Sequence, residues 1–77
     1  MENKDILKRV IELFSTISEA EEITEDSELI EDLDVSSMDV LYLISSLEEE
    51  FKIKVPEKEI RKMVTIGDVV EVVENLI

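Results

Sequence analysis

Apolar side chains recur at spacings of three and four residues in three separate parts of the chain. This period is typical of helices that bury one face. It predicts a first helix from Lys4 to Ser18, a second from Ser37 to Phe51, and a last helix that opens with Thr65 as its cap. The second helix has the clearest stripe, with apolar residues at relative positions 0, 3, 4, 7 and 11: Val40, Leu43, Ile44, Leu47 and Phe51.

The segments between these helices differ from one another. Residues 18–36 form a connector with nine acids, yet four spaced apolar residues (Ile23, Leu29, Ile30 and Leu33) should pin it, so we expect an ordered loop with a helical turn at Leu29 to Leu33. Residues 51–55 alternate apolar and charged side chains, and without a second strand to pair with they should form an extended connector. Pro56 suits the start of a short helix over residues 57–62.

These elements predict an all-α fold, a four-helix bundle with a long acidic loop between helices 1 and 2 and a short third helix. A chain of 77 residues makes one small domain over residues 1–77. It contains no cysteine and no histidine, which removes disulfides, the usual zinc ligands and the usual general base. We therefore expect no catalytic residue, no metal site and no enzyme activity of its own.

The excess of acidic residues restricts the classes of partner that the protein can bind. The formal net charge is −13, and the window from Val10 to Phe51 holds fourteen acids and no Lys or Arg. Such a surface repels phosphate, which disfavours nucleic acid and anionic membranes. It favours partners with basic patches, although the charge alone is equally consistent with a role in solubility. No apolar run is long enough to span a bilayer, and the charged N-terminus shows no targeting pattern, so the default location is the cytoplasm.

The junction of the acidic connector and the second helix carries the candidate chemistry. Ser36 and Asp39 match a Ser-x-x-Asp capping pattern, which would make Ser36 the N-cap and Ser37 the first helical residue. A phosphoryl group on Ser37 would lie at the positive end of the helix dipole. No neighbouring group could activate Ser37, so another enzyme would have to modify it. From the local sequence alone, ordinary capping is the favoured explanation of both serines.

A second face of this helix is partly apolar, with Met38, Leu41, Tyr42 and Ser45 in helical spacing before a run of glutamates. This mixture favours a docking surface over simple burial. A calcium loop is disfavoured, because Asp32, Asp34 and Ser36 fit an EF-hand but the required Gly and Glu positions hold Ser37 and Leu43.

Taken together, the motifs resemble the acyl carrier protein family over nearly the whole chain. The matching segments are residues 29–33, Ser36-Ser37-Met38-Asp39, Leu47-Glu48-Glu49-Glu50-Phe51, Val55-Pro56 and Thr65-Ile66-Gly67-Asp68. The resemblance implies a carrier that holds acyl intermediates as thioesters on a covalent 4′-phosphopantetheine arm attached to Ser37. It implies docking through Met38, Asp39, Leu41, Ser45, Glu48 and Glu49, and an acyl pocket lined by Leu43, Leu47, Ile60 and Ile66. The implied partners are a phosphopantetheinyl transferase and acyl-processing synthases with basic docking patches, and the carrier is expected to be a monomer.

The chain departs from the family pattern near the attachment site. The motif aspartate is Ser36, the usual leucine is Met38, and the usual glycine three residues before the modified serine is Asp34. Tyr42 stands where an acid is common and Ser45 where an apolar residue is common. These changes favour a specialised carrier with its own enzymes. They leave open two alternatives, an unmodified acidic adaptor with a carrier fold and an aminoacyl or peptidyl carrier.

Overall fold

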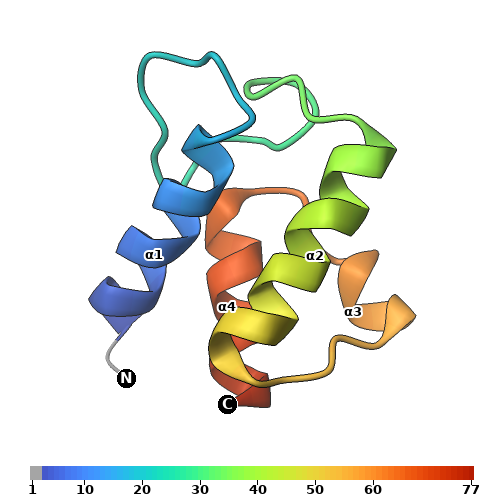
Figure 1. The fold of residues 1–77 in the computed structure, drawn as a ribbon. Coiled ribbons are helices and arrows are strands. Elements are labelled where there is room, and N and C mark those ends of the chain that lie inside the picture. Colours follow the sequence, from blue (N-terminus) through green and yellow to red (C-terminus); the bar gives the residue numbers. More distant parts are fainter. Residues whose placement is uncertain (1–2) are drawn as a thin grey trace.

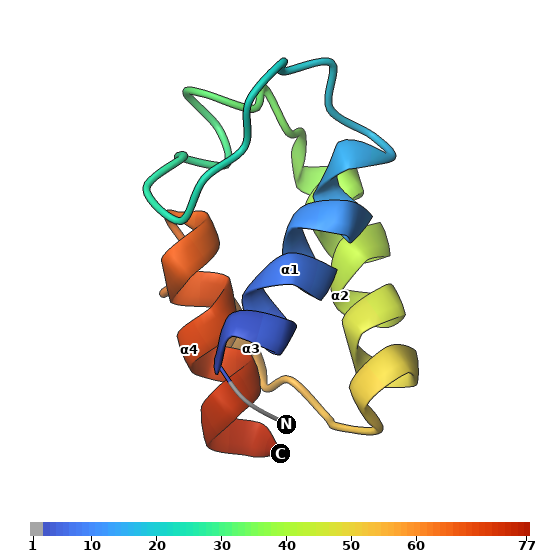
Figure 2. The same cartoon turned by 90° about the vertical axis from the view of Figure 1, so that its left-hand side faces the viewer.

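The computed structural model describes residues 3–77 and contains four helices (Figure 1). They are α1 (Asn3–Ser15), α2 (Ser37–Phe51), α3 (Glu57–Ile60) and α4 (Ile66–Leu76). The predicted all-α fold, with its long acidic loop and short third helix, is confirmed. The long loop covers one end of the bundle, the end at which α2 and α4 begin (Figures 1 and 2).

The apolar stripes of the three longer helices meet in one core. The loop and the α2–α3 connector add to it, because Leu29, Leu33, Ile53 and Val55 are buried with the helical residues. The most deeply buried side chains come from α1, α2 and α4: Ile6, Val10, Leu43, Leu47, Ile66, Val69 and Val73. Ile53 and Val55 are buried and Phe51 is half-buried, so the apolar residues of the predicted extended connector face the core. Burial of apolar surface stabilises a folded protein by about 25 cal/mol per Å². Packing of these stripes therefore provides most of the stability of the helices.

Two helix ends differ from their predicted positions. α1 ends at Ser15 rather than Ser18, and the hydroxyls of Ser15 and Thr16 donate to the carbonyls of Glu12 and Leu13 at 2.7 Å each. Such back-bonding competes with continuation of the helix. α3 ends at Ile60 rather than residue 62 and has no buried residue, so little packing extends it. The predicted bounds of α2 are confirmed.

A short antiparallel contact fastens the acidic loop to the beginning of α4. The Leu29 N–H donates to the Val64 carbonyl at 2.9 Å, and the Ile66 N–H donates to the Ser27 carbonyl at 3.0 Å, around a single bridge between Glu28 and Thr65. The predicted helical turn is also present, since the Asp32 N–H donates to the Glu28 carbonyl at 2.9 Å. The loop is therefore ordered by backbone hydrogen bonds as well as by its apolar residues.

Candidate functional site

The first turn of α2 is closed by a reciprocal capping box. The Asp39 N–H donates to Ser36 Oγ at 3.2 Å, and the Ser36 N–H donates to Asp39 Oδ2 at 3.2 Å. The Ser36 hydroxyl also donates to Asp39 Oδ2 at 3.0 Å. Ser36 has extended backbone angles, as an N-cap requires. The predicted capping role of Ser36 is confirmed, and its hydroxyl both accepts and donates a hydrogen bond in this role.

Ser37 has different surroundings although it is the next residue. It is the first residue of α2 and is exposed, and its hydroxyl makes no hydrogen bond with any other residue between 3 and 77. The amide groups of a first helical turn lack intrahelical partners and lie at the positive end of the helix dipole. An anion joined to the Ser37 oxygen would be stabilised there by about 0.3–1 kcal/mol, against repulsion from the acids of the preceding loop.

The backbone before the two serines turns sharply at Asp34, which has a φ of 54°. This left-handed conformation explains why a glycine is usual at the position in the family that the sequence resembles. Aspartate tolerates it better than most residues with a β-carbon. The Val35 N–H then donates to the Leu29 carbonyl at 2.9 Å. Together, the turn and this hydrogen bond fix the path of the backbone that leads to Ser36.

The second face of α2 is exposed, as its mixed pattern predicted. Met38, Leu41 and Tyr42 expose 80%, 60% and 62% of their surfaces, and Ser45 and Glu49 are also exposed. Singly exposed apolar residues are common, but three on one helix face form a patch that a partner could cover. Ile30 is 62% exposed, so the prediction that it helps to pin the loop is wrong, and its neighbour Leu29 is buried instead. Val64 is 53% exposed, and the sequence pattern did not predict this because the residue lies in an irregular segment.

Two of the acids expected to dock have internal hydrogen bonds. The Asp39 carboxylate belongs to the capping box, and Glu48 Oε2 accepts from the Val55 N–H at 2.8 Å, which ties the α2–α3 connector to α2. Both residues are half-buried, whereas Glu49 is exposed. The Glu48 bond spans seven residues across a turn of the chain, so no local sequence signal predicts it.

An ion pair between α1 and α2 was also not predicted from the sequence. Arg9 donates to both carboxylate oxygens of Glu50, from Nε at 2.6 Å and from Nη2 at 3.1 Å. The hydrogen bond from Arg9 lowers the pKa of Glu50, and the same bond raises the pKa of Arg9. Both groups are exposed, so their contribution to stability is small. The pair leaves Glu50 less available than Glu49 for a partner.

The four residues expected to line an acyl pocket belong to the core or pack against it. Leu43, Leu47 and Ile66 are buried, and Ile60 of α3 is half-buried against the core cluster. Leu43 and Leu47 follow one another on the inner face of α2, while Ile66 begins α4. In this structure the four side chains pack against the core cluster, and a chain entering between them would have to displace α3 or α2.

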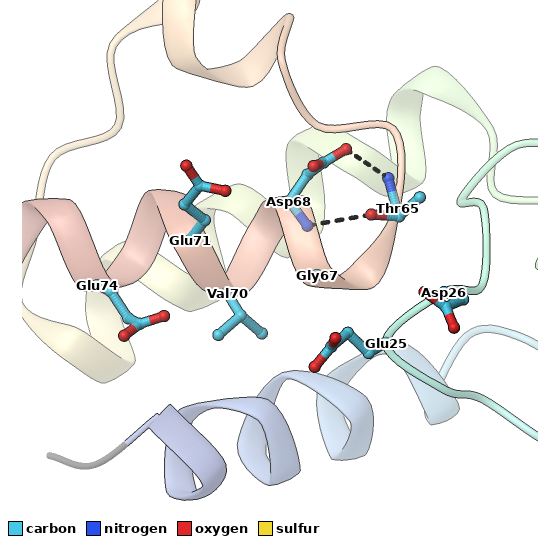
Figure 3. Close-up of a pocket in the computed structure, with 8 residues that line it drawn as sticks. All are labelled: Glu25, Asp26, Thr65, Gly67, Asp68, Val70, Glu71 and Glu74. Carbon is cyan, nitrogen blue, oxygen red and sulfur yellow. Dashed lines mark hydrogen bonds between the residues drawn. The ribbon is translucent and has the colours of Figure 1, made fainter.

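The cleft in Figure 3 lies between the acidic loop and α4 and has a volume of about 320 Å³. Its lining is mostly acidic: Glu25, Asp26, Thr65, Gly67, Asp68, Val70, Glu71 and Glu74. The Gly67 N–H donates to the Glu25 carbonyl at 2.8 Å, and a β-carbon on Gly67 would lie 3.0 Å from Glu25 Cγ. Glycine therefore permits the loop to approach α4 this closely.

Two features are absent from residues 3–77. No group of three or more acids there is arranged to hold a metal ion. No helix in the same range is long and apolar enough to cross a membrane.

Comparison with known proteins decides the family. The profile of the family described as "Phosphopantetheine attachment site" matches residues 4–73. The chain is 41% identical to an acyl carrier protein of Wolinella succinogenes over 71 residues, which cover 92% of this chain and 91% of the relative. It is 45% identical to an acyl carrier protein of Campylobacter hominis over 67 residues, covering 87% and 82%. The chain belongs to the acyl carrier protein family.

An acyl carrier protein is a carrier and not an enzyme, and its family is defined by a covalent 4′-phosphopantetheine attachment site. The geometry at the start of α2 fits such a group, because Ser37 offers an exposed oxygen at the positive end of the helix dipole, where the amides of Ser37 and Met38 lack a helical partner. When bound, the group supplies the thiol that holds an acyl chain. Carriers of this family interact with phosphopantetheinyl transferases and with synthases.

Proposed function

We propose that Ser37 is the residue that carries 4′-phosphopantetheine and that the protein presents acyl thioesters to fatty-acid, polyketide or related synthases. The contrast between the two adjacent serines carries the proposal. The Ser36 hydroxyl both accepts and donates hydrogen bonds in the capping box, whereas the Ser37 hydroxyl is exposed and has no partner in residues 3–77. A transferase can therefore reach Ser37 without opening the first turn of α2.

This chain orients the oxygen but does not activate it. Residues 3–77 hold no histidine, and the basic residues of the chain lie outside the window from Val10 to Phe51. The base that removes the Ser37 proton must come from the transferase. The oxygen then attacks the phosphorus that bears the pantetheine group in the pyrophosphate of coenzyme A. The bridging P–O bond breaks, adenosine 3′,5′-bisphosphate leaves, and a phosphodiester remains on the carrier.

We propose that partner enzymes dock on the exposed face of α2. Its apolar part consists of Met38, Leu41 and Tyr42, with Ser45 below them. Glu49 is the acid most available to a basic patch. Asp39 and Glu48 remain in the proposed surface, but each carboxylate already accepts an internal hydrogen bond, so their replacement would also perturb α2 and its connector.

We propose further that the acyl chain enters the core between α2 and α3, against Leu43, Leu47, Ile60 and Ile66. Support comes from α3, which spans four residues and contributes none that is fully buried. Such an element can move outward at low cost because few apolar contacts hold it. The monomeric state and the cytoplasmic location predicted from the sequence belong to the same proposal.

The experiment uses the full chain, coenzyme A and a phosphopantetheinyl transferase, with intact-mass spectrometry as the readout. The wild-type protein should gain the mass of one phosphopantetheine group. Ser37→Ala should abolish the gain, and Ser36→Ala, the matched control one residue away, should retain it. The reverse pattern would move the attachment site to Ser36. If several transferases left every mass unchanged, the protein would be an unmodified adaptor with a carrier fold.

A further inference from the structure

The positive charge of the chain is concentrated around α3. Residues 52–62 hold five of the eight basic residues and two acids, a local net charge of +3 that leaves −16 for the rest of the chain. We call residues 52–62 the cationic segment. Its basic residues are Lys52, Lys54, Lys58, Arg61 and Lys62. A protein that only needed negative charge for solubility would gain nothing from this separation.

The fold turns the first lysines of the cationic segment outward. Ile53 and Val55 alternate with Lys52 and Lys54, and burial of the two apolar residues sends the two lysines to solvent. Figure 1 shows this connector leaving the C-terminal end of α2 and running to α3. The hydrogen bond from the Val55 N–H to Glu48 Oε2, at 2.8 Å, fixes the connector beside α2.

That side of α2 belongs to its exposed face. Leu41 and Glu48 are seven residues apart, about two helical turns, and therefore lie one above the other. The cationic segment is thus anchored on the same side of α2 as Leu41, about 10 Å further toward the C-terminal end of the helix. A partner that covers Leu41 and Ser45 and extends to that end of α2 meets the segment as well.

Part of the segment is neutralised internally and part is not. Arg61 donates to Glu57 at 3.0 Å, and Lys62 lies 3.3 Å from Glu59. The Lys62 and Glu59 side chains also line a cleft with Asp68 and Glu71 of α4. Lys52, Lys54 and Lys58 are exposed and form no ion pair within the described residues. These three lysines form the part of the segment that is open to a partner.

We infer that the enzymes served by this carrier present an acidic patch to Lys52, Lys54 and Lys58 beside the basic patch that meets the acids of α2 and the loop. The inference rests on the proposed function. It also supplies a basis for selection, because an enzyme whose docking face is basic throughout would place like charges against the three lysines. Like-charge contacts of this kind discriminate between partners more than they change the affinity for the right one.

The salt dependence of binding should distinguish this surface from the acidic surface of the loop and α2. The molecule measures 29 × 24 × 18 Å. At 0.01 M salt the Debye length is about 30 Å, so an acidic probe at the cationic segment feels the repulsion of the whole chain. At 0.1 M it is about 10 Å, and the local lysines dominate. Binding of an acidic probe should therefore rise and then fall with salt, whereas binding of a basic probe to the loop and α2 should only fall.

The test is a titration of the isotope-labelled full chain with a short poly-glutamate peptide, followed by backbone amide chemical shifts at several salt concentrations. The expected shifts fall in residues 52–62 and are largest near 0.1 M salt. The variant Lys52→Gln/Lys54→Gln/Lys58→Gln should lose them. The matched control Lys4→Gln/Lys8→Gln, which removes two exposed lysines of α1, should keep them. A poly-lysine peptide should instead shift the loop and α2.

Two outcomes would overturn the inference. One is the absence of peptide-induced shifts in residues 52–62 at every salt concentration. The other is a stronger response of the same residues to phosphatidylglycerol vesicles than to the peptide, which would assign the segment to a membrane surface. Neither result depends on modification of Ser37, which intact-mass spectrometry measures separately.

Discussion

Replacing Ser36 by alanine should lower the free energy of unfolding by about 1 kcal/mol. The change removes two hydrogen bonds, the one that Ser36 Oγ accepts from the Asp39 N–H at 3.2 Å and the one it donates to Asp39 Oδ2 at 3.0 Å. The bond from the Ser36 N–H to Asp39 Oδ2, at 3.2 Å, survives because its donor is backbone. Ser36 is exposed, so water replaces the lost partners and limits the loss.

Urea and thermal unfolding, followed by far-ultraviolet circular dichroism, measure this loss. For a domain of this size, 1 kcal/mol corresponds to a decrease in Tm of about 4–8 °C. Ser37→Ala is the matched control. Its hydroxyl has no partner in residues 3–77 and alanine is the better helix former, so its stability should stay within about 0.5 kcal/mol of the wild type.

A third variant tests whether the stability depends on having a capping side chain at position 36 or on serine in particular. Ser36→Asp keeps an acceptor for the Asp39 N–H, and aspartate caps helices as well as serine does. It also brings a second carboxylate close to Asp39, so it should recover only part of the loss. An equal loss in Ser36→Ala and Ser37→Ala would refute the division of roles between the two serines, whatever the modification experiment gave.

Two further predictions concern the loop and the start of α4. Asp34→Gly should raise the free energy of unfolding by about 0.5–1 kcal/mol in urea, because the φ of 54° strains a residue with a β-carbon, and Asp34→Asn should change it less; no gain with glycine would contradict this. The hydrogen bond from the Thr65 N–H, at 3.0 Å, lowers the pKa of Asp68. The stabilisation is therefore complete above the unfolded-state pKa and disappears as the pH falls through the lower folded-state value. The stability difference between the wild type and Asp68→Asn should shrink on acidification below about pH 4, and a difference that did not change with pH would argue against this assignment.

Local sequence was sufficient for the elements whose cause is local. The spacing of Val40, Leu43, Ile44 and Leu47 predicted α2, and the Ser36–Asp39 pattern predicted its cap, because periodicity and capping act within one or two turns. The Thr65–Asp68 cap of α4 is confirmed for the same reason, with a full capping box in the structure. Helix ends were predicted less well, since Ser15 and Thr16 can bond backward to end α1 or leave it to continue.

The family was readable from the sequence because its motifs run without a gap along the chain, and the profile match over residues 4–73 confirms it. Composition also excluded an enzyme that uses histidine or cysteine. The Ser36–Asp39 spacing predicted Ser36 as the cap and Ser37 as the first helical residue. The hydrogen bonds of the folded chain confirm the cap, and they show that the Ser36 hydroxyl is engaged while Ser37 is exposed.

Tertiary structure decided what depends on contacts between distant segments. The tie of Leu29 to Val64, the bond from Val55 to Glu48 and the ion pair of Arg9 with Glu50 join residues whose spacing carries no periodic signal. These contacts determine which acids remain available at the surface and where the lysines of residues 52–62 lie relative to α2. The sequence thus determined the helices and the family, while the long-range contacts determined the composition of the docking surface.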